Sequence, residues 1–330
     1  LSKHGYNKTT IETLGVQLEQ EGYEVNYASN KMTFLFRLLD MMLAVFIYRK
    51  KVTCILIDTY STKAFWYAFV CSQLARVFNI KYIPILHGGN LPNRLQKNPK
   101  LCQMVFANAY QNIAPSGYLK QAFESTGFKN VIHIPNSIEI DKYEFKARTE
   151  LTPKLLWVRA FASIYNPQMA VKVLQQLQEK YPSATLTMVG PDKDGSLQTT
   201  KAFAKSIGVA VNFTGQLAKE DWWQLASEHD IFINTTHFDN TPVSVMEAMA
   251  LGLPVVSTNV GGIPYLLTDK ENALLVPDND DKAMAKVILD LLEDQEKVNL
   301  VTRNARSFIA QMDWKAVKEE WKGVLKLERG

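Results

Sequence analysis

Two acidic residues, Asp239 and Glu247, lie eight positions apart in the stretch HFDNTPVSVMEAMALGLPVVSTNVGG (237–262). The residues around Glu247 have the spacing of a helix that is apolar on nearly all sides, which predicts a buried helix. A buried carboxylate needs hydrogen-bond donors, because burial of an unpaired charge is costly. The hydroxyl groups of a sugar ligand would serve. An internal salt bridge or a solvent-facing side chain is the alternative.

The N-terminal end of this predicted helix is a candidate anion site. Thr241 is a favourable N-cap, and Pro242, which has no amide hydrogen, suits the first helical position. The amides of Val243 and Ser244 are then open donors at the partly positive end of the helix. Such an end is well suited to phosphate. Glu247 shares the face of these two residues and leans back toward the same end.

A basic residue and two glycines follow other predicted strands. Arg159 comes directly after the strand 155–158, where its guanidinium can bind a phosphate through two hydrogen bonds. Gly190 and Gly215 end two later strands, where a glycine either lets the backbone approach a ligand closely or simply marks a turn. Open parallel sheets bind ligands beyond the carboxyl ends of their strands, so we expect these residues to converge.

The elements that must position these residues alternate between short β-rich runs and longer helical patterns. This alternation predicts α/β architecture, with parallel sheets covered by helices on both faces, in two doubly wound units. The predicted strands span residues 24–29, 54–60, 81–88, 111–116, 131–135, 155–158, 185–190, 211–215, 231–236, 254–258 and 273–277.

The segment 136–154 is polar, lacks both periods and is the best candidate for a linker. We therefore expect an N-terminal domain over residues 1–145 and a C-terminal domain over 150–312. An amphipathic helix in residues 313–330 is expected to pack back on the N-terminal domain. The chain opens on a loop that leads directly into a helical pattern. Because a strand should precede that loop in an α/β domain, we expect the first strand to be missing from this sequence.

Composition argues against several classes of protein. The 330 residues include 37 basic and 33 acidic ones, a formal net charge of +4, so we expect no nucleic-acid partner. Cys54, Cys71 and Cys102 form no paired motif and are expected to be reduced thiols in a cytoplasmic protein. Two Asp-x-Asp pairs, at 192–194 and 278–280, have the composition of turns, so no metal site is expected.

The most hydrophobic run, residues 32–48, contains Arg37 and Asp40 and is shorter than the about 20 residues that a membrane span needs. It is expected to form an amphipathic core helix. The alternative is a helix that lies on a membrane surface, helped by the basic residues 49–51 that follow it. That alternative would place the protein at the inner face of a membrane as a peripheral contact.

The stretch from Asp239 to Gly262 resembles the retaining glycosyltransferases of family 4. The family pattern is two acidic residues separated by seven others, followed by EAMA-x-G-x-PVV-x-T-x-x-GG. Further similarity lies in ILHGG (85–89), NIAPSGYLKQAFESTGF (112–128) and VIHIPNSIEIDKY (131–143). The resemblance covers nearly the whole chain and implies the GT-B fold, in which two Rossmann-like domains face a cleft.

The resemblance also implies roles for the C-terminal site residues. Glu247 would hold the ribose hydroxyls of a nucleoside-diphosphate sugar, and Asp239 would face the donor sugar. Arg159, together with the helix amides near Val243 and Ser244, would hold the diphosphate. The nucleotide sugar would be a substrate, and no cofactor is expected.

In the N-terminal domain, the resemblance implies that His87 hydrogen-bonds the transferring sugar. A satisfied core histidine at a strand end is the alternative. Gly5 would lie by the phosphates or the acceptor. The implied reaction is retaining transfer of a hexose to the hydroxyl of a saccharide or lipid-linked acceptor, in cell-envelope polysaccharide or glycolipid synthesis. A GT-B epimerase or phosphorylase, or a non-catalytic nucleotide-sugar binder, remains the alternative.

The chain departs from the family pattern at three places. Asp239 stands where glutamate is usual, which shortens the side chain by one methylene. No lysine follows Arg159 at the usual distance, and Tyr165 and Asn166 occupy that region. Tyr265 replaces a common glutamate. Phosphate affinity and the choice of donor are therefore the properties that we expect to differ.

Overall fold

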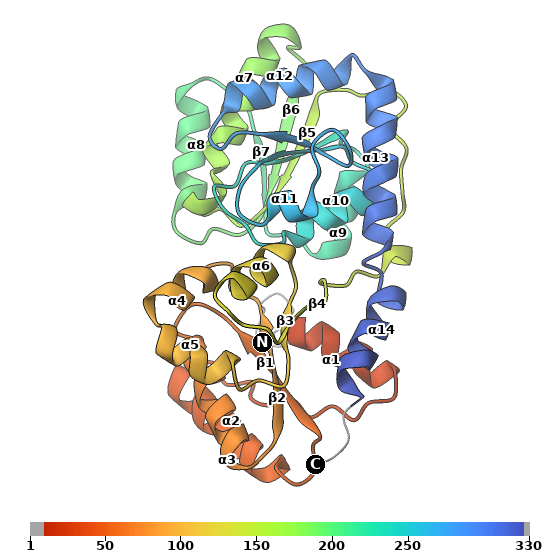
Figure 1. Cartoon of the computed structure of the whole chain (residues 1–330). Helices are drawn as coiled ribbons and strands as arrows, with labels where there is room; N and C mark the ends of the chain where they lie inside the picture. The colour runs from red at the N-terminus through yellow and green to blue at the C-terminus, as the bar shows by residue number, and fades with distance from the viewer. Residues whose placement is uncertain (1–9, 327–330) are drawn as a thin grey trace. The chain divides into compact units, whose positions relative to one another are not determined.

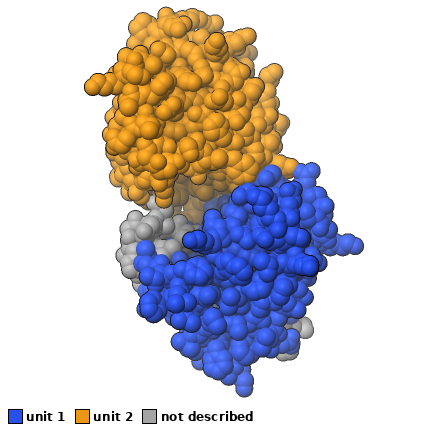
Figure 2. Space-filling view, turned by 90° about the vertical axis from the view of Figure 1, so that its left-hand side faces the viewer, with its two compact units in different colours: residues 1–137, 314–330 blue, residues 138–313 orange. Residues whose placement is uncertain are grey.

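The computed structural model describes residues 10–326, and the chain divides into two compact units (Figures 1 and 2). Unit 1 comprises residues 1–137 and 314–330, and unit 2 comprises residues 138–313. The structure thus places the boundary at Ser137, earlier than the predicted boundary near 145.

Unit 1 contains, among the described residues, a four-stranded parallel sheet in the order β1-β2-β3-β4. Every residue of β2 after the first is buried, because helices cover both faces of this central strand. Ile83 and Ile85 pack with α1 and α14 on one face, and Leu86 packs with α3, α4, α5 and α6 on the other. The strands are β1 (Cys54–Thr59), β2 (Lys81–Leu86), β3 (Asn112–Ala114) and β4 (Val131–His133).

The helices of unit 1 come from both ends of the chain. The C-terminal helix α14 contributes Trp314, Val317 and Trp321 to the same core cluster as Leu14 and Leu18 of α1. The helices are α1 (Thr10–Gln20), α2 (Phe34–Tyr48), α3 (Phe65–Val77), α4 (Leu91–Lys97), α5 (Pro99–Phe106), α6 (Gly117–Ser125) and α14 (Trp314–Leu325).

The strand predicted at residues 24–29 does not form. Its alternating pattern does direct Tyr23 and Val25 toward the core of unit 1. However, a strand also needs a hydrogen-bonded neighbour, and in the described part of the chain β1 pairs only with β2. The segment is therefore irregular, and that prediction was wrong.

Unit 2 contains a six-stranded parallel sheet in the order β10-β9-β8-β5-β6-β7. The chain moves outward from β5 to β7, returns to the other side of β5 at β8, and moves outward again. The order therefore reverses between β5 and β8, which makes the gap between these strands a topological switch point. The strands are β5 (Lys154–Val158), β6 (Thr185–Val189), β7 (Asn212–Gly215), β8 (Ile231–Asn234), β9 (Val255–Thr258) and β10 (Leu274–Val276).

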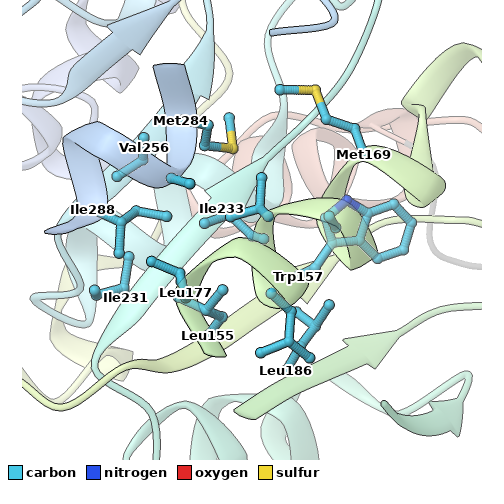
Figure 3. Close-up of a cluster of buried hydrophobic side chains, with 14 of the residues drawn as sticks. Leu155, Trp157, Met169, Leu177, Leu186, Ile231, Ile233, Val256, Met284 and Ile288 are labelled. Carbon is cyan, nitrogen blue, oxygen red and sulfur yellow. The ribbon is translucent and has the colours of Figure 1, made fainter. Parts of the chain in front are cut away.

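Alternate residues of β5 supply the two cores of unit 2. Leu155 and Trp157 face the cluster drawn in Figure 3, under α7, α8 and α12, whereas Leu156 faces the cluster under α9, α10 and α13. Helices thus cover both faces of the sheet, as expected. They are α7 (Pro167–Lys180), α8 (Ser196–Ser206), α9 (Lys219–Ala226), α10 (Val243–Ala250), α11 (Ile263–Leu266), α12 (Asp281–Leu292) and α13 (Gln295–Ala310).

The segment predicted to be a linker packs on unit 2 instead. Tyr143 is buried, and the buried guanidinium of Arg148 donates hydrogen bonds to the carbonyl oxygens of Leu251 (2.6 Å) and Ala226 (3.1 Å). The segment is thus held against unit 2 by Tyr143 and Arg148, whereas most of its other polar side chains are exposed to solvent.

Candidate active site

Two of the predicted site residues of unit 2, Arg159 and Asp239, meet at the switch point. Arg159 follows β5, and Asp239 lies in the loop after the adjacent strand β8. The guanidinium of Arg159 forms an ion pair with the Asp239 carboxylate and lies over the ring of Tyr165, 4.1 Å from its centroid. The structure therefore brings Arg159 and Asp239 together. The ring of Tyr165 packs against the flat face of the guanidinium.

Burial sets the chemistry of this ion pair. Both side chains are only 13% exposed. Burial raises the pKa of Asp239, whereas the Arg159 charge and a hydrogen bond from the Asn240 amide (2.8 Å) oppose that rise. Arg159 retains a buried donor, because no described residue accepts a hydrogen bond from its Nε atom. That atom is available to a ligand.

The predicted glycines shape the backbone around Arg159. Gly190 has a φ of +151°, and a Cβ atom there would lie 1.8 Å from the carbonyl oxygen of Arg159. Its amide donates to the carbonyl of Gly215 (2.8 Å), which has a φ of +74°. The two glycines therefore join the ends of three neighbouring strands. Position 190 requires glycine because the Arg159 carbonyl lies too close for a side chain, and not only because the chain turns there.

A second pair of glycines holds the loop that carries Asp239. The amide of Gly262 donates to the carbonyl of Asp239 (2.7 Å). A Cβ atom at Gly262 would lie 2.0 Å from the carbonyl oxygen of Asn240, and one at Gly261 would lie 2.5 Å from that of Asp239. Any larger residue at either position would move the carboxylate.

Helix α10 begins one residue later than predicted. Pro242, not Thr241, is the N-cap, with an extended backbone (φ −71°, ψ 113°) and no capping side chain. The φ of proline suits an extended N-cap as well as a first helical turn. The Pro242 carbonyl accepts the first helical hydrogen bond, from the amide of Val245 (3.1 Å). The amides of Val243 and Ser244 thus precede the hydrogen-bonded part of the helix, as predicted.

The hydroxyl group of Ser244 is buried at this helix end, and no described residue forms a hydrogen bond with it. Buried polar atoms are nearly always paired in folded proteins, so an unpaired one beside an open helix end is a candidate ligand contact. The hydroxyl, two open amides and the positive end of α10 together form a candidate site for an anion.

Glu247 is buried on α10, with 3% of its surface exposed. Its Oε1 atom accepts hydrogen bonds from the Tyr143 hydroxyl (3.0 Å) and from the Lys219 ammonium (2.7 Å). Burial raises the pKa of Glu247, and these two partners oppose the rise. The carboxylate therefore has the internal salt bridge considered above. Both partners bind the same oxygen, however, which leaves Oε2 for other donors.

Sequence reasoning missed Lys219 and Tyr143. Lys219 begins α9 just beyond the end of β7, a place where ligand-binding residues are expected, but no local pattern marks it. Its side chain is 58% exposed and reaches the buried carboxylate from the surface. Tyr143 lies in the supposed linker and packs against Trp223, with ring centroids 4.5 Å apart and the ring planes tilted by 53°. The indole nitrogen of Trp223 is also buried without a partner among the described residues.

A second constellation lies in unit 1, at the carboxyl ends of β1 and β2. His87 Nε2 is 2.9 Å from Oδ1 of Asp58, and the two side chains are 8% and 17% exposed. The backbone there is tightly held. Thr59 accepts hydrogen bonds from the amides of His87 (3.0 Å) and Gly88 (3.2 Å). Asp58, an acidic residue within an apolar strand, is a signal in the sequence that the prediction overlooked.

Gly5 lies outside the described residues. In the Asp-x-Asp pairs, Asp194 accepts hydrogen bonds from the amides of Ser163 (2.8 Å) and Ser196 (3.1 Å), and Asp280 caps α12 through the amide of Ala283 (2.8 Å). Within residues 10–326, no group of three His, Cys, Asp or Glu side chains could hold a metal ion.

Residues 139–308, more than half of the chain, match the family described as glycosyl transferases group 1. The chain belongs to this family. It is 30% identical to an uncharacterized glycosyltransferase of Haemophilus influenzae over 156 residues, which are 47% of this chain and 44% of that protein. It is 26% identical to the amylovoran biosynthesis glycosyltransferase AmsK of Erwinia amylovora over 247 residues, 70% of this chain and 60% of that one. The chain thus spans less than two thirds of these relatives.

Solved structures agree on the fold. Anabaena Alr3699/HepE in complex with UDP-glucose superposes with a TM-score of 0.75 at 19% identity, covering 95% of this chain and 88% of that one. Sucrose-phosphate synthase from Thermosynechococcus elongatus gives a TM-score of 0.77, also at 19% identity, with 95% and 91% covered. The expected α/β fold with two Rossmann-like GT-B domains is confirmed, as is the resemblance to GT-B glycosyltransferases.

Proposed function

We propose that this protein is a retaining family 4 glycosyltransferase that transfers a hexose from a nucleoside-diphosphate sugar to an acceptor hydroxyl. The observation that carries the proposal is the set of unpaired buried donors at the switch point of unit 2. The Nε atom of Arg159 and the hydroxyl of Ser244 are buried without partners among the described residues. Leaving such a group unpaired costs about 1–3 kcal/mol, and the oxygens of a diphosphate would pair both.

Glu247 supports a nucleotide rather than a simple anion. Its Oε2 atom has no partner among the described residues and lies on the same helix as the anion site, so it can accept hydrogen bonds from ribose hydroxyls. A UDP-sugar is the first donor to test, because the similar HepE structures contain UDP and UDP-glucose.

The proposed chemistry depends on charge at the leaving group. The acceptor oxygen attacks the anomeric carbon, the bond from that carbon to the diphosphate oxygen breaks, and the acceptor proton passes to the departing phosphate. Negative charge therefore grows on the diphosphate. Arg159 and the N-terminal end of α10 are fixed donors at that position, which is the electrostatic route to rate enhancement. We propose that these groups supply the positive charge without a metal ion, and we therefore expect activity to persist in chelator.

The acceptor and the setting are also proposals. We propose a saccharide or lipid-linked acceptor in cell-envelope polysaccharide or glycolipid synthesis, with the similarity to AmsK as support. The three cysteines are free thiols, which is compatible with a cytoplasmic location.

Donor binding and turnover test the proposal separately. UDP-, GDP- and ADP-sugars are screened by thermal shift and by release of the nucleoside diphosphate in the presence and absence of acceptor. We expect one donor to stabilise the protein and to turn over with acceptor. Ser244→Ala should weaken its binding about tenfold, since a charge-assisted hydrogen bond is lost. Ser206→Ala, on the surface of α8, is the matched control. Binding without product indicates a non-catalytic binder, and turnover without acceptor or with inorganic phosphate indicates an epimerase or phosphorylase.

A further inference from the structure

Helix α2 of unit 1 presents an apolar face to solvent. Its side chains recur at intervals of three or four residues, so they form one stripe along the helix. The most exposed is Phe36, at 65%. We call this stripe the α2 face. It consists of Met32, Phe36, Leu39, Leu43, Phe46 and Ile47, all exposed.

The opposite side of α2 is packed normally. Val45 is buried in a cluster with Ala68, Cys71 and Ala75 of α3. Phe34 stacks on Tyr67 with ring centroids 4.8 Å apart. Figure 1 shows α2 and α3 side by side at the edge of their unit. One side of α2 therefore packs against α3, and the α2 face on the other side remains exposed.

The charged residues beside the α2 face are mostly basic. Residues 31–51 contain five basic residues and a single acidic one, Asp40, which is a net charge of +4 and equals that of the whole chain. Lys50 and Lys51 are exposed just beyond the C-terminal end of α2, and Lys31 is exposed before its start. Arg49 lies over the ring of Phe46, 3.9 Å from its centroid. An apolar stripe with cations at both ends is complementary to an anionic lipid surface.

We infer that the α2 face is a peripheral binding site for an anionic membrane. The apolar side chains would enter the boundary between headgroups and acyl chains, and the lysines would contact lipid phosphates. None of the helices within residues 10–326 is long and apolar enough to cross a membrane, so the contact would lie in the interface plane. A shallow groove of about 480 Å³ beside Lys31 and Phe36 follows the same face. The inference does not depend on the proposed transfer reaction.

Co-sedimentation with lipid vesicles tests this inference. We expect the protein to bind vesicles that contain phosphatidylglycerol in phosphatidylcholine, to bind pure phosphatidylcholine vesicles weakly, and to dissociate as salt is raised. Phe36→Asp with Leu39→Asp, and separately Lys50→Glu with Lys51→Glu, should each weaken binding about tenfold or more. Leu300→Asp alters an equally exposed apolar residue on α13 of unit 2 and should leave vesicle binding unchanged.

Circular dichroism checks whether each variant is folded. If the Phe36→Asp, Leu39→Asp variant does not fold, the Lys50→Glu, Lys51→Glu variant still tests the inference. Absence of binding to anionic vesicles by the unaltered protein would overturn the inference. So would binding that the α2 variants do not weaken. A dimer in light scattering that the Phe36→Asp, Leu39→Asp variant dissociates, without any vesicle binding, would assign the face to a second copy of the chain instead.

Discussion

Arg159 and Asp239 form an ion pair at the point where the strand order of unit 2 reverses. The guanidinium is thus paired with a carboxylate of its own unit, and its buried Nε atom has no partner among the described residues. In the proposed function this Nε atom would face the anion site at the N-terminal end of α10. A diphosphate in that site would share Arg159 with Asp239. The two residues should therefore have opposite effects on nucleotide binding, even though they contact each other.

Arg159→Ala is expected to lower kcat/KM by about 100-fold to 1,000-fold, because it removes a donor aimed at the charge that grows on the leaving group. It should also weaken UDP binding, measured by calorimetry. Loss of the ion pair leaves Asp239 buried, so the free energy of unfolding should fall by about 1–3 kcal/mol. Lys205→Ala, at the end of α8, controls for the loss of a cation. UDP affinity that survives Arg159→Ala would contradict this role.

Asp239→Asn is expected to keep or tighten UDP binding while kcat falls. The amide keeps the shape of the side chain but removes a negative charge beside the diphosphate. The loss of kcat follows if the carboxylate faces the donor sugar. Calorimetry with UDP and steady-state turnover separate the two effects. Weaker UDP binding together with unchanged kcat would assign Asp239 to nucleotide binding instead.

Glu247 should make stability depend on pH. Burial raises its pKa in the folded chain above the ordinary value of 4.5. As pH rises from that value to the folded-state pKa, the unfolded chain has lost the proton while the folded chain keeps it, so the stability contributed by this group falls. Glu247→Gln does not titrate. The difference in free energy of unfolding, variant minus wild type, should therefore increase with pH across this window and then become constant.

Urea denaturation at a series of pH values from about 4 to 8 measures this difference. Glu124→Gln, at an exposed position on α6, controls for simple removal of a carboxylate. A difference between Glu247→Gln and wild type that decreases with pH would show that Lys219 and Tyr143 outweigh burial in setting the charge state of Glu247.

Gly190→Ala is expected to destabilise unit 2 by several kcal/mol and to displace Arg159. The new methyl group would meet the Arg159 carbonyl oxygen at 1.8 Å, and the backbone atoms there cannot yield. Gly195→Ala is the matched control. Gly195 also has a positive φ (+87°), but nothing lies within 4 Å of its added Cβ atom. It should lose only the about 1–2 kcal/mol of left-handed strain. Equal losses of stability in thermal denaturation would refute the close-approach argument.

Asp58 is expected to act through His87. Asp58→Asn should lower kcat about tenfold or more, since the carboxylate orients the imidazole through Nε2. The thermal shift produced by UDP should not change, because the anion site belongs to unit 2. His87→Ala should have a similar effect on kcat, and the double variant should be little worse than either single variant. Additive losses would show that the two residues act independently.

Most strands and part of the candidate site could be predicted from the sequence. Periods of two and of three to four residues located ten of the eleven predicted strands, because most of those strands are buried between helices and leave an apolar run. The stretch 237–262 placed Glu247 on a buried helix behind an open N-terminal end. The rule that ligands bind beyond parallel strands then grouped Arg159 with that helix. The first two of these inferences depend only on residues close together in the chain, and the third adds a general rule about parallel sheets.

Tertiary structure decided which groups are partners. Asp58 meets His87 across 29 positions, Arg159 meets Asp239 across 80, and Tyr143 meets Glu247 across 104. Residues 24–29 have the pattern of a strand but no described neighbour to pair with. Local periodicity reports whether a side chain faces the interior. Local periodicity does not show which distant side chain that residue will contact, because the contact depends on the order of the strands in the sheet.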